Sequence, residues 1–268
     1  MELNPDEYYD NLDKIFSEAA PIYDQKIQTN FINVGIREKE VESVLKRYKK
    51  GWKVLEIGCG TGEEARKVMK STGCELTCLD ISGGMLNFAS SKMDKYGLSD
   101  KFIAVKMPAS SLGSIKGKFG IVYSFNGALN NEPILPRFFH ALVDAVETGG
   151  YFIVSVRNRL SLGEVMADII GLRFRILFGR IKGDVTVEVV GRGVKSHYFY
   201  NSEFLKLVPS CFKLEQIRGL GIFATPSFHE KIRMEGARSL LRELETAFAD
   251  FPPFNRLGDE TLFVFQKN

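Results

Sequence analysis

The chain has 268 residues, of which 44% are hydrophobic and 26% are charged, and its formal net charge is +3. These values predict a globular protein with a substantial core, and the charge is too small to indicate a nucleic-acid partner. The first residues are acidic and lack the apolar segment of a secretory signal, and no run approaches the roughly 20 apolar residues of a membrane span. Four cysteines in so long a chain predict neither a disulfide framework nor a metal site. We expect a cytoplasmic protein in which residues 1–268 form one α/β domain.

Two helices are expected within residues 1–50, and a strand over 52–57 follows and ends in a glycine-rich turn. Gly58, Gly60 and Gly62 can adopt positive φ and let a ligand approach the backbone closely. Thr61 and Glu64 have the spacing of a capping box, which predicts a helix over 62–72 whose free N–H groups face the turn. A strand, a glycine turn and a helix N-terminus together predict a cofactor site.

The details of this turn argue against a dinucleotide. The dinucleotide fingerprint needs a third glycine at position 63, where this chain has Glu63. Glu56, two residues before the first glycine, suits an ammonium or sulfonium ligand better than a pyrophosphate. The pattern E-x-G-x-G-x-G resembles motif I of the class I S-adenosylmethionine (SAM) methyltransferases. The resemblance implies that SAM binds here and leaves as S-adenosylhomocysteine (SAH), with contacts from Glu56, Gly58, Cys59, Gly60, Thr61 and Gly62.

Residues 16–24 carry a second part of the resemblance. Their sequence, FSEAAPIYD, is similar to the F-x-x-x-A-x-x-Y-D element that precedes motif I in the ubiquinone/menaquinone-type methyltransferases. The tyrosine of that family lies over the methionine end of SAM, and the resemblance carries this role to Tyr23. Packing within a helix is the alternative for an aromatic side chain at this place. Helices within residues 1–50 are accordingly expected to cover the cofactor.

The next strand, over 75–80, ends in Asp80. This acid follows the first glycine by about 20 residues, the interval expected of a ribose-binding carboxylate. An ionised carboxylate accepts strong hydrogen bonds from both ribose hydroxyls. We assign Ile81 and Met85, at the start of a helix over 83–95, to the same site. The alternative is a surface acid ahead of a helix that Ser82 caps.

A third strand is expected over 102–106 and a fourth over 119–125. Methyltransferases of this type commonly carry Asp-Ala after the third strand, where the acid meets the adenine amino group. This chain has Met107-Pro108-Ala109-Ser110 instead, so the acid is missing. Adenine recognition is then expected from backbone groups near Ala109 and Ser110 with Met107 as an apolar wall, because Pro108 can donate no N–H.

The remaining pattern completes the expected fold. The segment that begins with Phe125 and Asn126 resembles the one that lies beneath the sulfonium in small-molecule methyltransferases. A helix over 135–148 and a strand over 150–156 continue the alternation, which predicts a parallel sheet with helices on both faces. The family adds a sixth strand and an antiparallel seventh, for which 212–217 and 261–266 are candidates. We therefore expect an α/β, Rossmann-like, seven-stranded, mostly parallel sheet with an antiparallel last strand.

Two insertions, residues 157–200 and 220–258, lie outside the minimal fold and are expected to cap the substrate over the active site. Ser161 and Glu164 form a capping box before an apolar stripe with basic flanks. This pattern is compatible with three roles: a lid over an apolar acidic substrate, a peripheral membrane contact through 161–182, or packing on the core or on a dimer mate. The stripe comprises Leu162, Val165, Met166, Ile169, Ile170, Phe174 and Leu177, and the basic residues are Arg157, Arg159, Arg173, Arg175, Arg180 and Lys182.

A hairpin with arms over 185–190 and 194–200 is expected next, and Asn201 is expected to cap a helix over 202–207. His197 on the second arm is the candidate general base, because its ordinary pKa is near neutral. A hydrogen-bonded strand histidine is the alternative. In the second insertion, a helix should extend to about residue 248, and Phe228 and His229 are further pocket candidates.

The expected activity is transfer of a methyl group from SAM to a small, apolar or aromatic metabolite by in-line displacement, which depends mainly on proximity and orientation. A nucleic-acid or protein methyltransferase and a noncatalytic SAM-binding protein are the alternatives. The residues after the fourth strand lack the N-P-P-Y clamp of base methyltransferases, which makes nucleic acid the less favoured substrate. A monomer and a homodimer are both compatible with the sequence.

Overall fold

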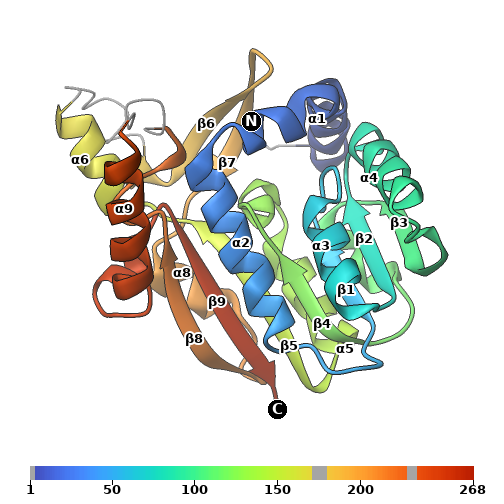
Figure 1. Ribbon diagram of the computed structural model, residues 1–268. Coiled ribbons are helices and arrows are strands. Elements are labelled where there is room, and N and C mark those ends of the chain that lie inside the picture. Colours follow the sequence, from blue (N-terminus) through green and yellow to red (C-terminus); the bar gives the residue numbers. More distant parts are fainter. Residues whose placement is uncertain (1–3, 171–179, 228–233) are drawn as a thin grey trace.

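In the computed structural model, which describes residues 4–170, 180–227 and 234–268, seven strands form one sheet in the order β3-β2-β1-β4-β5-β9-β8 (Figure 1). Strands β1 to β5 are parallel, and β9 runs antiparallel to both of its neighbours. The expected mostly parallel sheet is confirmed. Its strands are β1 (Val54–Ile57), β2 (Leu76–Asp80), β3 (Phe102–Lys106), β4 (Phe119–Ser124), β5 (Val146–Arg157), β8 (Phe212–Leu220) and β9 (Glu260–Lys267).

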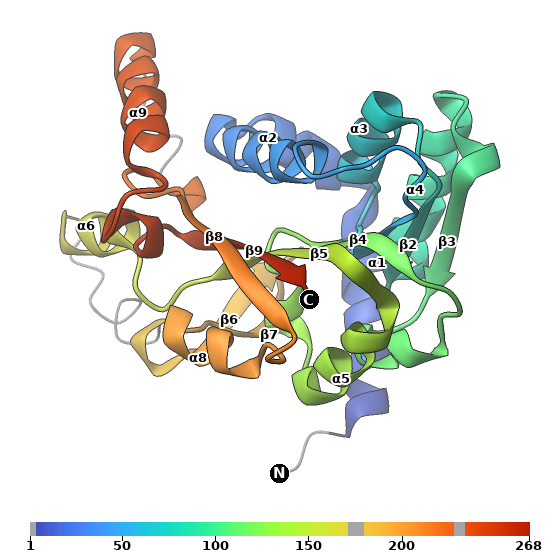
Figure 2. The same cartoon turned by 90° about the horizontal axis from the view of Figure 1, so that it is seen from below.

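Helices cover both faces of this sheet, as Figure 2 shows. On one face lie α2 (Phe31–Leu45), α3 (Glu63–Thr72) and α4 (Gly83–Lys95), and on the other lie α5 (Leu135–Ala145) and α8 (Asn201–Leu207). Successive strand residues point to opposite faces, so Val54 belongs to the first core and Leu55 to the second. The two-sided burial explains why the central strands are almost wholly apolar.

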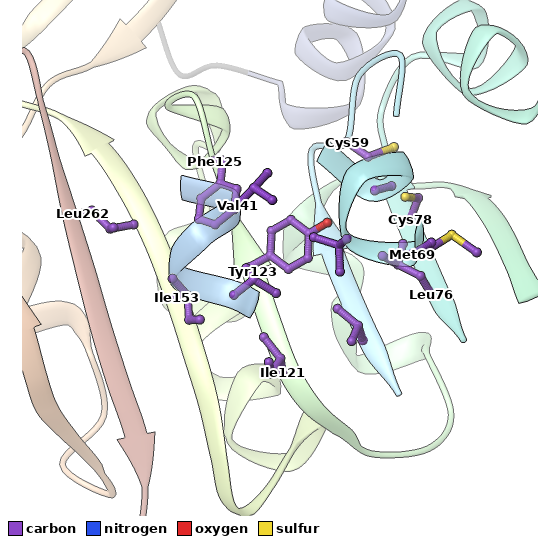
Figure 3. Close-up of a cluster of buried hydrophobic side chains, with 14 of the residues drawn as sticks. Val41, Cys59, Met69, Leu76, Cys78, Ile121, Tyr123, Phe125, Ile153 and Leu262 are labelled. Carbon is purple, nitrogen blue, oxygen red and sulfur yellow. The ribbon is translucent and has the colours of Figure 1, made fainter. Parts of the chain in front are cut away.

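Tyr123 of β4 lies near the centre of the first core (Figure 3). Its side chain is fully buried, and its ring centroid is 4.8 Å from that of Phe125. The hydroxyl donates a 3.0 Å hydrogen bond to the Glu56 carboxylate of β1. A buried hydroxyl and a buried acid thus satisfy each other inside an otherwise apolar layer.

Helix α1 (Pro5–Gln28) lies across the carboxyl ends of the parallel strands and packs on α4. Side-chain hydrogen bonds fix it to segments that follow β1, β2 and β3. Asp24 accepts from the Thr61 hydroxyl at 2.5 Å, and Ser17 lies 2.9 Å from the Ser82 hydroxyl. Because these bonds reach several strand ends, α1 roofs the edge of the sheet where the predicted cofactor residues lie.

The described parts of the insertions form α6 (Leu162–Ile170), the hairpin β6 (Asp184–Val189) and β7 (Arg192–His197), and α9 (Glu235–Phe248). The hairpin packs on α1, where Val194 joins Leu12 and Ile15 in a small cluster. No helix among the described residues has the length and apolar character needed to cross a membrane. Several residues named from the sequence lie outside the described ranges: Arg173, Phe174, Arg175, Leu177, Phe228 and His229.

Two helix starts differ from the predicted capping. Helix α3 begins after Gly62, which has φ +72° and offers no side chain, while Thr61 bonds to α1; the predicted capping box at this helix is therefore wrong. Asn201 is the first residue of α8 and not its cap, because the Glu203 carboxylate accepts the Tyr200 N–H at 3.0 Å. The Asn201 side chain instead donates to the Arg256 backbone oxygen at 3.1 Å, so in both places a tertiary hydrogen bond that no local pattern predicts engages the side chain.

The remaining boundaries follow the sequence more closely. Helix α5 ends at Ala145 and not at residue 148, because β5 already begins at Val146. Ser161 accepts the Glu164 N–H at 3.3 Å, so half of that predicted capping box is present, but the Glu164 carboxylate accepts from Ser227. Four 3-10 turns complete the described chain: η1 (Ser99–Lys101), η2 (Ala109–Ser114), η3 (Ala128–Asn131) and η5 (Phe254–Arg256).

Candidate functional site

A cavity with about 920 Å³ of empty space, including its mouth, lies beneath α1 at the carboxyl ends of β1 to β4. The structure brings most of the residues predicted for the cofactor site into its wall. Those residues are Tyr23, Gly58, Cys59, Gly60, Thr61, Asp80, Ile81, Met85, Met107, Pro108, Ala109, Phe125 and Asn126. Segments that are far apart in the chain thus meet at one edge of the sheet, as parallel strands require.

Glu56 differs from the prediction because it lies behind the cavity wall. Only 2% of this residue is exposed, and its carboxylate accepts from Tyr123 and lies 3.6 Å from the Cys78 sulfur. Burial, and next the charge of Glu64, raises the pKa of Glu56 well above its usual value. Because β-strand residues alternate in direction, Glu56 points into the first core while its neighbour Ile57 reaches the cavity.

Gly62 and Ser110 also lie outside the wall. A Cβ added to Gly62 would come within 2.9 Å of the Ala89 side chain, so this glycine serves the close approach of α3 and α4. The Ser110 N–H donates to the carboxylate of Glu132 at 3.1 Å, and it is Glu132 that lines the cavity. Neither residue belongs to the cavity wall in this arrangement.

His197 is placed away from the cavity, at the end of β7. Its Nδ1 lies 2.8 Å from the Asp184 carboxylate across the hairpin, and its ring packs edge-on against Phe199 at 4.7 Å. The described residues of both insertions likewise contribute nothing to the cavity wall. The hairpin packs on α1 instead, where Val194 lies in one apolar cluster with Leu12 and Ile15.

The glycine turn is shaped for close approach. Gly58 has φ +72°, and a Cβ there would lie 2.3 Å from the Ala128 side chain, so only glycine fits. Gly60 has φ +52°, and its added Cβ would meet only the Tyr23 ring, at 3.9 Å, which leaves its backbone face open toward the cavity. The turn therefore offers backbone groups to a ligand and is covered by the ring of Tyr23.

Asp80 lies at the end of β2 and is held in place by the backbone. The N–H groups of Gly60 and Ser82 donate to its two carboxylate oxygens at 2.7 and 2.8 Å. Burial raises the pKa of Asp80 to about 6, and these two N–H groups oppose the rise. A carboxylate fixed in this way keeps free lone pairs that can accept from ligand hydroxyls.

Arg37 of α2 is a wall residue that the sequence did not reveal. Its Nη1 lies 2.9 Å from the Glu64 carboxylate in a buried ion pair, and its Nη2 donates a long bond of 3.4 Å to the Tyr23 hydroxyl. Burial alone would lower the pKa of Arg37, but the charge of Glu64 raises it above its ordinary value. The Nε atom is buried without a hydrogen-bond partner. Arg37 lines the cavity, and a guanidinium there is suited to an anionic group of a ligand.

Glu132 supplies an acid near the segment where the sequence lacks one. Its carboxylate lines the cavity and accepts from the Tyr9 hydroxyl at 2.5 Å, from Ser110 N–H at 3.1 Å and from Ile134 N–H at 2.9 Å. It therefore lies next to the segment Met107–Ser110 although it follows β4. The sequence did not indicate Glu132 as a site residue, because an acid was expected after β3 and this one follows β4.

Comparisons with known proteins agree with this geometry. The sequence profile of a family described as a methyltransferase domain matches residues 54–150. A sterol 24-C-methyltransferase of Gibberella zeae is 32% identical over 104 residues, which are 39% of this chain and 27% of that protein. A ubiquinone/menaquinone biosynthesis C-methyltransferase of Rhizobium johnstonii is 25% identical over 53% of this chain and 57% of its own length. The chain thus covers less than two thirds of either relative.

A solved structure shows the same fold over nearly the whole chain. An S-adenosylmethionine-dependent methyltransferase from Clostridium acetobutylicum superposes with a TM-score of 0.59 and 14% sequence identity. The match covers 93% of this chain and 97% of that one.

Proposed function

We propose, from the premise that this chain belongs to the class I SAM-dependent methyltransferases, that it transfers a methyl group from SAM to a small-molecule acceptor. The observation that carries the proposal is the single cavity wall that joins the glycine turn, Asp80 and the partly unsatisfied Arg37. These groups match the three parts of SAM that need polar recognition.

The residues present fit SAM. Asp80 would accept from the ribose hydroxyls, and the Arg37 guanidinium, whose Nε has no partner, would bind the methionine carboxylate. The apolar side chains of Ile81 and Met107 would flank the adenine, and Glu132 would supply the acid that is absent after β3. Tyr23 over the open face of Gly60 would cover the opposite end.

The charge of the wall suits a cationic ligand. The described wall of the cavity contains three acids, Glu64, Asp80 and Glu132, and one cationic side chain, Arg37. A sulfonium and an ammonium group are both attracted to such a surface, whereas a pyrophosphate would be repelled. This electrostatic argument favours SAM over a dinucleotide independently of the glycine pattern.

Bound SAM supplies the electrophilic methyl group, so the chain itself has to bind, orient and exclude water. The roof formed by α1 and the apolar wall residues Leu12, Phe16 and Phe125 serve the last purpose. The same apolar surface favours an apolar or aromatic acceptor. The names of the relatives, which refer to a sterol and to ubiquinone/menaquinone, point to the same class of molecule.

The test combines binding and turnover. Calorimetry should show binding of SAM and SAH but not of NAD, and Asp80→Asn should weaken both by about 10- to 100-fold, since hydrogen bonds to a charged group contribute about 1.5–3 kcal/mol. Asp100→Ala, at an exposed acid outside the cavity, is the matched control and should bind normally. Transfer of labelled methyl from SAM should then be measured on a panel of apolar and aromatic acceptors, with RNA and protein as comparison substrates.

Tight binding of NAD, or normal SAM affinity in Asp80→Asn, would refute the assignment of the cofactor site. Turnover confined to RNA or protein would refute the small-molecule acceptor while leaving the cofactor site intact. SAM binding without transfer to any substrate class would favour a noncatalytic SAM-binding protein.

A further inference from the structure

Behind the cavity wall at α2, the chain buries more acids than bases. Glu64 is paired with Arg37 at 2.9 Å, and Glu260 lies 3.8 Å from Arg157 in a looser pair. Glu40 of α2 is completely buried, and within the described part of the chain it forms no ion pair. Three carboxylates thus share two guanidinium groups, and one negative charge is left without a cation.

Glu40 is bound only by neutral donors. Its Oε1 accepts from the Ser155 hydroxyl at 2.5 Å and from the Asn126 N–H at 3.2 Å. Its Oε2 is buried with no hydrogen-bond partner. A lone ionised carboxylate in such surroundings is costly, so the group either keeps a proton or acquires a positive neighbour.

Glu260 of β9 belongs to the same arrangement. Glu260 pairs in register with Arg157 of β5, two residues after the Ser155 that donates to Glu40, and the Glu260 Oε2 atom also lacks a hydrogen-bond partner. Burial, and next the charge of Glu260, holds the pKa of Glu40 well above its ordinary value. Burial also raises the pKa of Glu260, against the opposing charge of Arg157. The protonation of two neighbouring buried acids of this kind is linked, because a charge on one raises the pKa of the other.

The acid pair lies directly behind the end of the cavity where the positive part of SAM would lie. Asn126, which bonds to Glu40 and has φ +55°, is in the cavity wall, and so is Arg37. Asp80 is the last residue of β2, and Met107 follows β3 at the edge of the sheet. With the ribose at Asp80 and the adenine toward β3, the methionine half has to extend toward β4 and α2, where the pair is found.

We propose that Glu40 and Glu260 form a charge-sensing pair, which holds one proton when the site is empty or contains SAH and releases it when the sulfonium of SAM is bound. The inference rests on the proposed function and deepens it, because it says how the site distinguishes substrate from product. SAM and SAH differ by a methyl group and one positive charge. Only the first of them offers the unpaired carboxylate a cation.

Other charged groups face the pair, and none of them changes this difference. They are Arg37 of α2, Glu64 of α3, Arg157 of β5 and Asp259 of β9, of which Asp259 is paired with Arg180 at 2.7 Å. Asp80 can also exchange a proton on ligand binding, but it contacts the part that SAM and SAH share. The number of protons that Asp80 exchanges is therefore the same for both ligands and cancels when proton release with SAM is compared with that with SAH.

The experiment measures proton release with the full chain. Calorimetry with SAM and with SAH is carried out between pH 5.5 and 7, below the ordinary pKa of an α-amino group, in buffers of different ionisation enthalpy. SAM should release up to one proton more than SAH. Where the pair titrates, the ratio of the SAH to the SAM dissociation constant should rise by up to tenfold per pH unit.

Glu40→Gln should abolish the difference, because the carboxylate without a cation is gone. Glu260→Gln should reduce it, because burial still favours a proton on Glu40 but the neighbouring charge is lost. Glutamine keeps the shape of either side chain, and bound SAH together with thermal unfolding verifies that both variants fold. The matched control is Glu245→Gln, since burial raises the pKa of that acid to about 7 on α9, in the wall of a different cavity, and it should keep the difference.

Equal proton release with SAM and SAH in the parent protein would overturn the inference, as would a difference that survives in both glutamine variants. Both results leave SAM binding intact and so leave the proposed function standing. If neither ligand binds the parent protein, the proposed function fails first. These outcomes separate the two proposals.

Discussion

The hydroxyl of Tyr9, on the first helix, donates a 2.5 Å hydrogen bond to the carboxylate of Glu132 on the opposite wall of the cavity. Burial, and next this bond, raises the pKa of Tyr9 above its ordinary value. The pair closes the side of the cavity near Ser110, whose hydroxyl lies 2.9 Å from the same tyrosine. The hydroxyl of Tyr9 thus joins α1 to the segment after β3 and to the segment after β4.

Tyr9→Phe removes this closure without removing the ring. We expect SAM affinity to fall by about 3- to 10-fold, because one hydrogen bond to a charged acceptor is lost while Glu132 retains its two backbone donors. Hydrogen exchange should become faster in α1 and stay unchanged in β4. Tyr96→Phe, at an exposed tyrosine on the far end of α4, serves as the control. Unchanged exchange in α1 would show that Tyr9 does not hold the roof.

The pH dependence of SAH binding should report Asp80. Its pKa is about 6 in the empty protein, and ligand hydroxyls bind the ionised form, so affinity should fall as the pH drops through about 6, by at most tenfold per unit. Asp80→Asn should bind weakly at every pH in this range. A parent protein whose SAH affinity stays constant from pH 7 to 5 would contradict the assignment of Asp80 to the ribose.

Asp80 should affect the stability of the protein in the opposite direction: SAH affinity rises with pH, whereas the free energy of unfolding falls. The folded pKa lies above the ordinary value of 3.8, so the folded protein binds more protons between about pH 4 and 6, and the contribution of Asp80 to the free energy of unfolding falls by about 3 kcal/mol as the pH rises through this window. Denaturant unfolding of the parent and of Asp80→Asn at pH 4.5 and 7 measures the difference. Asp80→Asn should gain stability relative to the parent at the higher pH.

Variants of the Arg37–Glu64 pair distinguish the contribution of Arg37 to stability from its contribution to SAM binding. Arg37→Met leaves Glu64 buried without its partner and should cost about 3–5 kcal/mol in the free energy of unfolding. Arg37→Met combined with Glu64→Gln removes the stranded charge and should recover most of this loss. SAM affinity should stay low in both variants, because neither carries a guanidinium for the carboxylate of the ligand. Recovery of affinity in the double variant would assign Arg37 a purely structural role.

Two glycines with similar backbone angles give a matched test of the turn. Gly73→Ala, at φ +69° with open space around the added methyl, should cost about 1 kcal/mol from backbone strain alone. Gly58→Ala has nearly the same φ but meets Ala128 at 2.3 Å, so it should cost clearly more and prevent SAM binding. Thermal unfolding and calorimetry measure both effects. Equal losses of stability in the two variants would mean that the turn at Gly58 rearranges to accommodate the added methyl group.

The sequence predicts the parallel sheet because its strands are apolar runs closed by glycines or by an acid. Gly58 and Asp80 can be found in this way, since the interval between them reflects a fixed βαβ geometry. Arg37 and Glu132 cannot, because each reaches the cavity through packing of a helix or turn that no local pattern specifies. His197 illustrates the converse: its strand was predicted, but the direction in which the hairpin leans decides which surface it meets, and that depends on α1.

The insertions show the same limit. Their helices and hairpin follow from apolar spacing, yet their described residues stay out of the cavity wall, so a role as a substrate cap remains a proposal. The glycine turn had the right composition for a capping box, but Thr61 bonds to Asp24 of α1 instead. Local signals fixed the elements, whereas contacts across the chain decided how the side chains were used.

The roof helix also constrains the order of folding. Tyr8 of α1 donates to the backbone oxygen of Lys195 at 3.1 Å, across a sequence separation of 187 residues. Contacts of such long range carry a large entropic cost and form late, after the strands that present their partners. Helix α1 is therefore among the last segments to settle, and until it does, the polar floor of the cavity stays open to water.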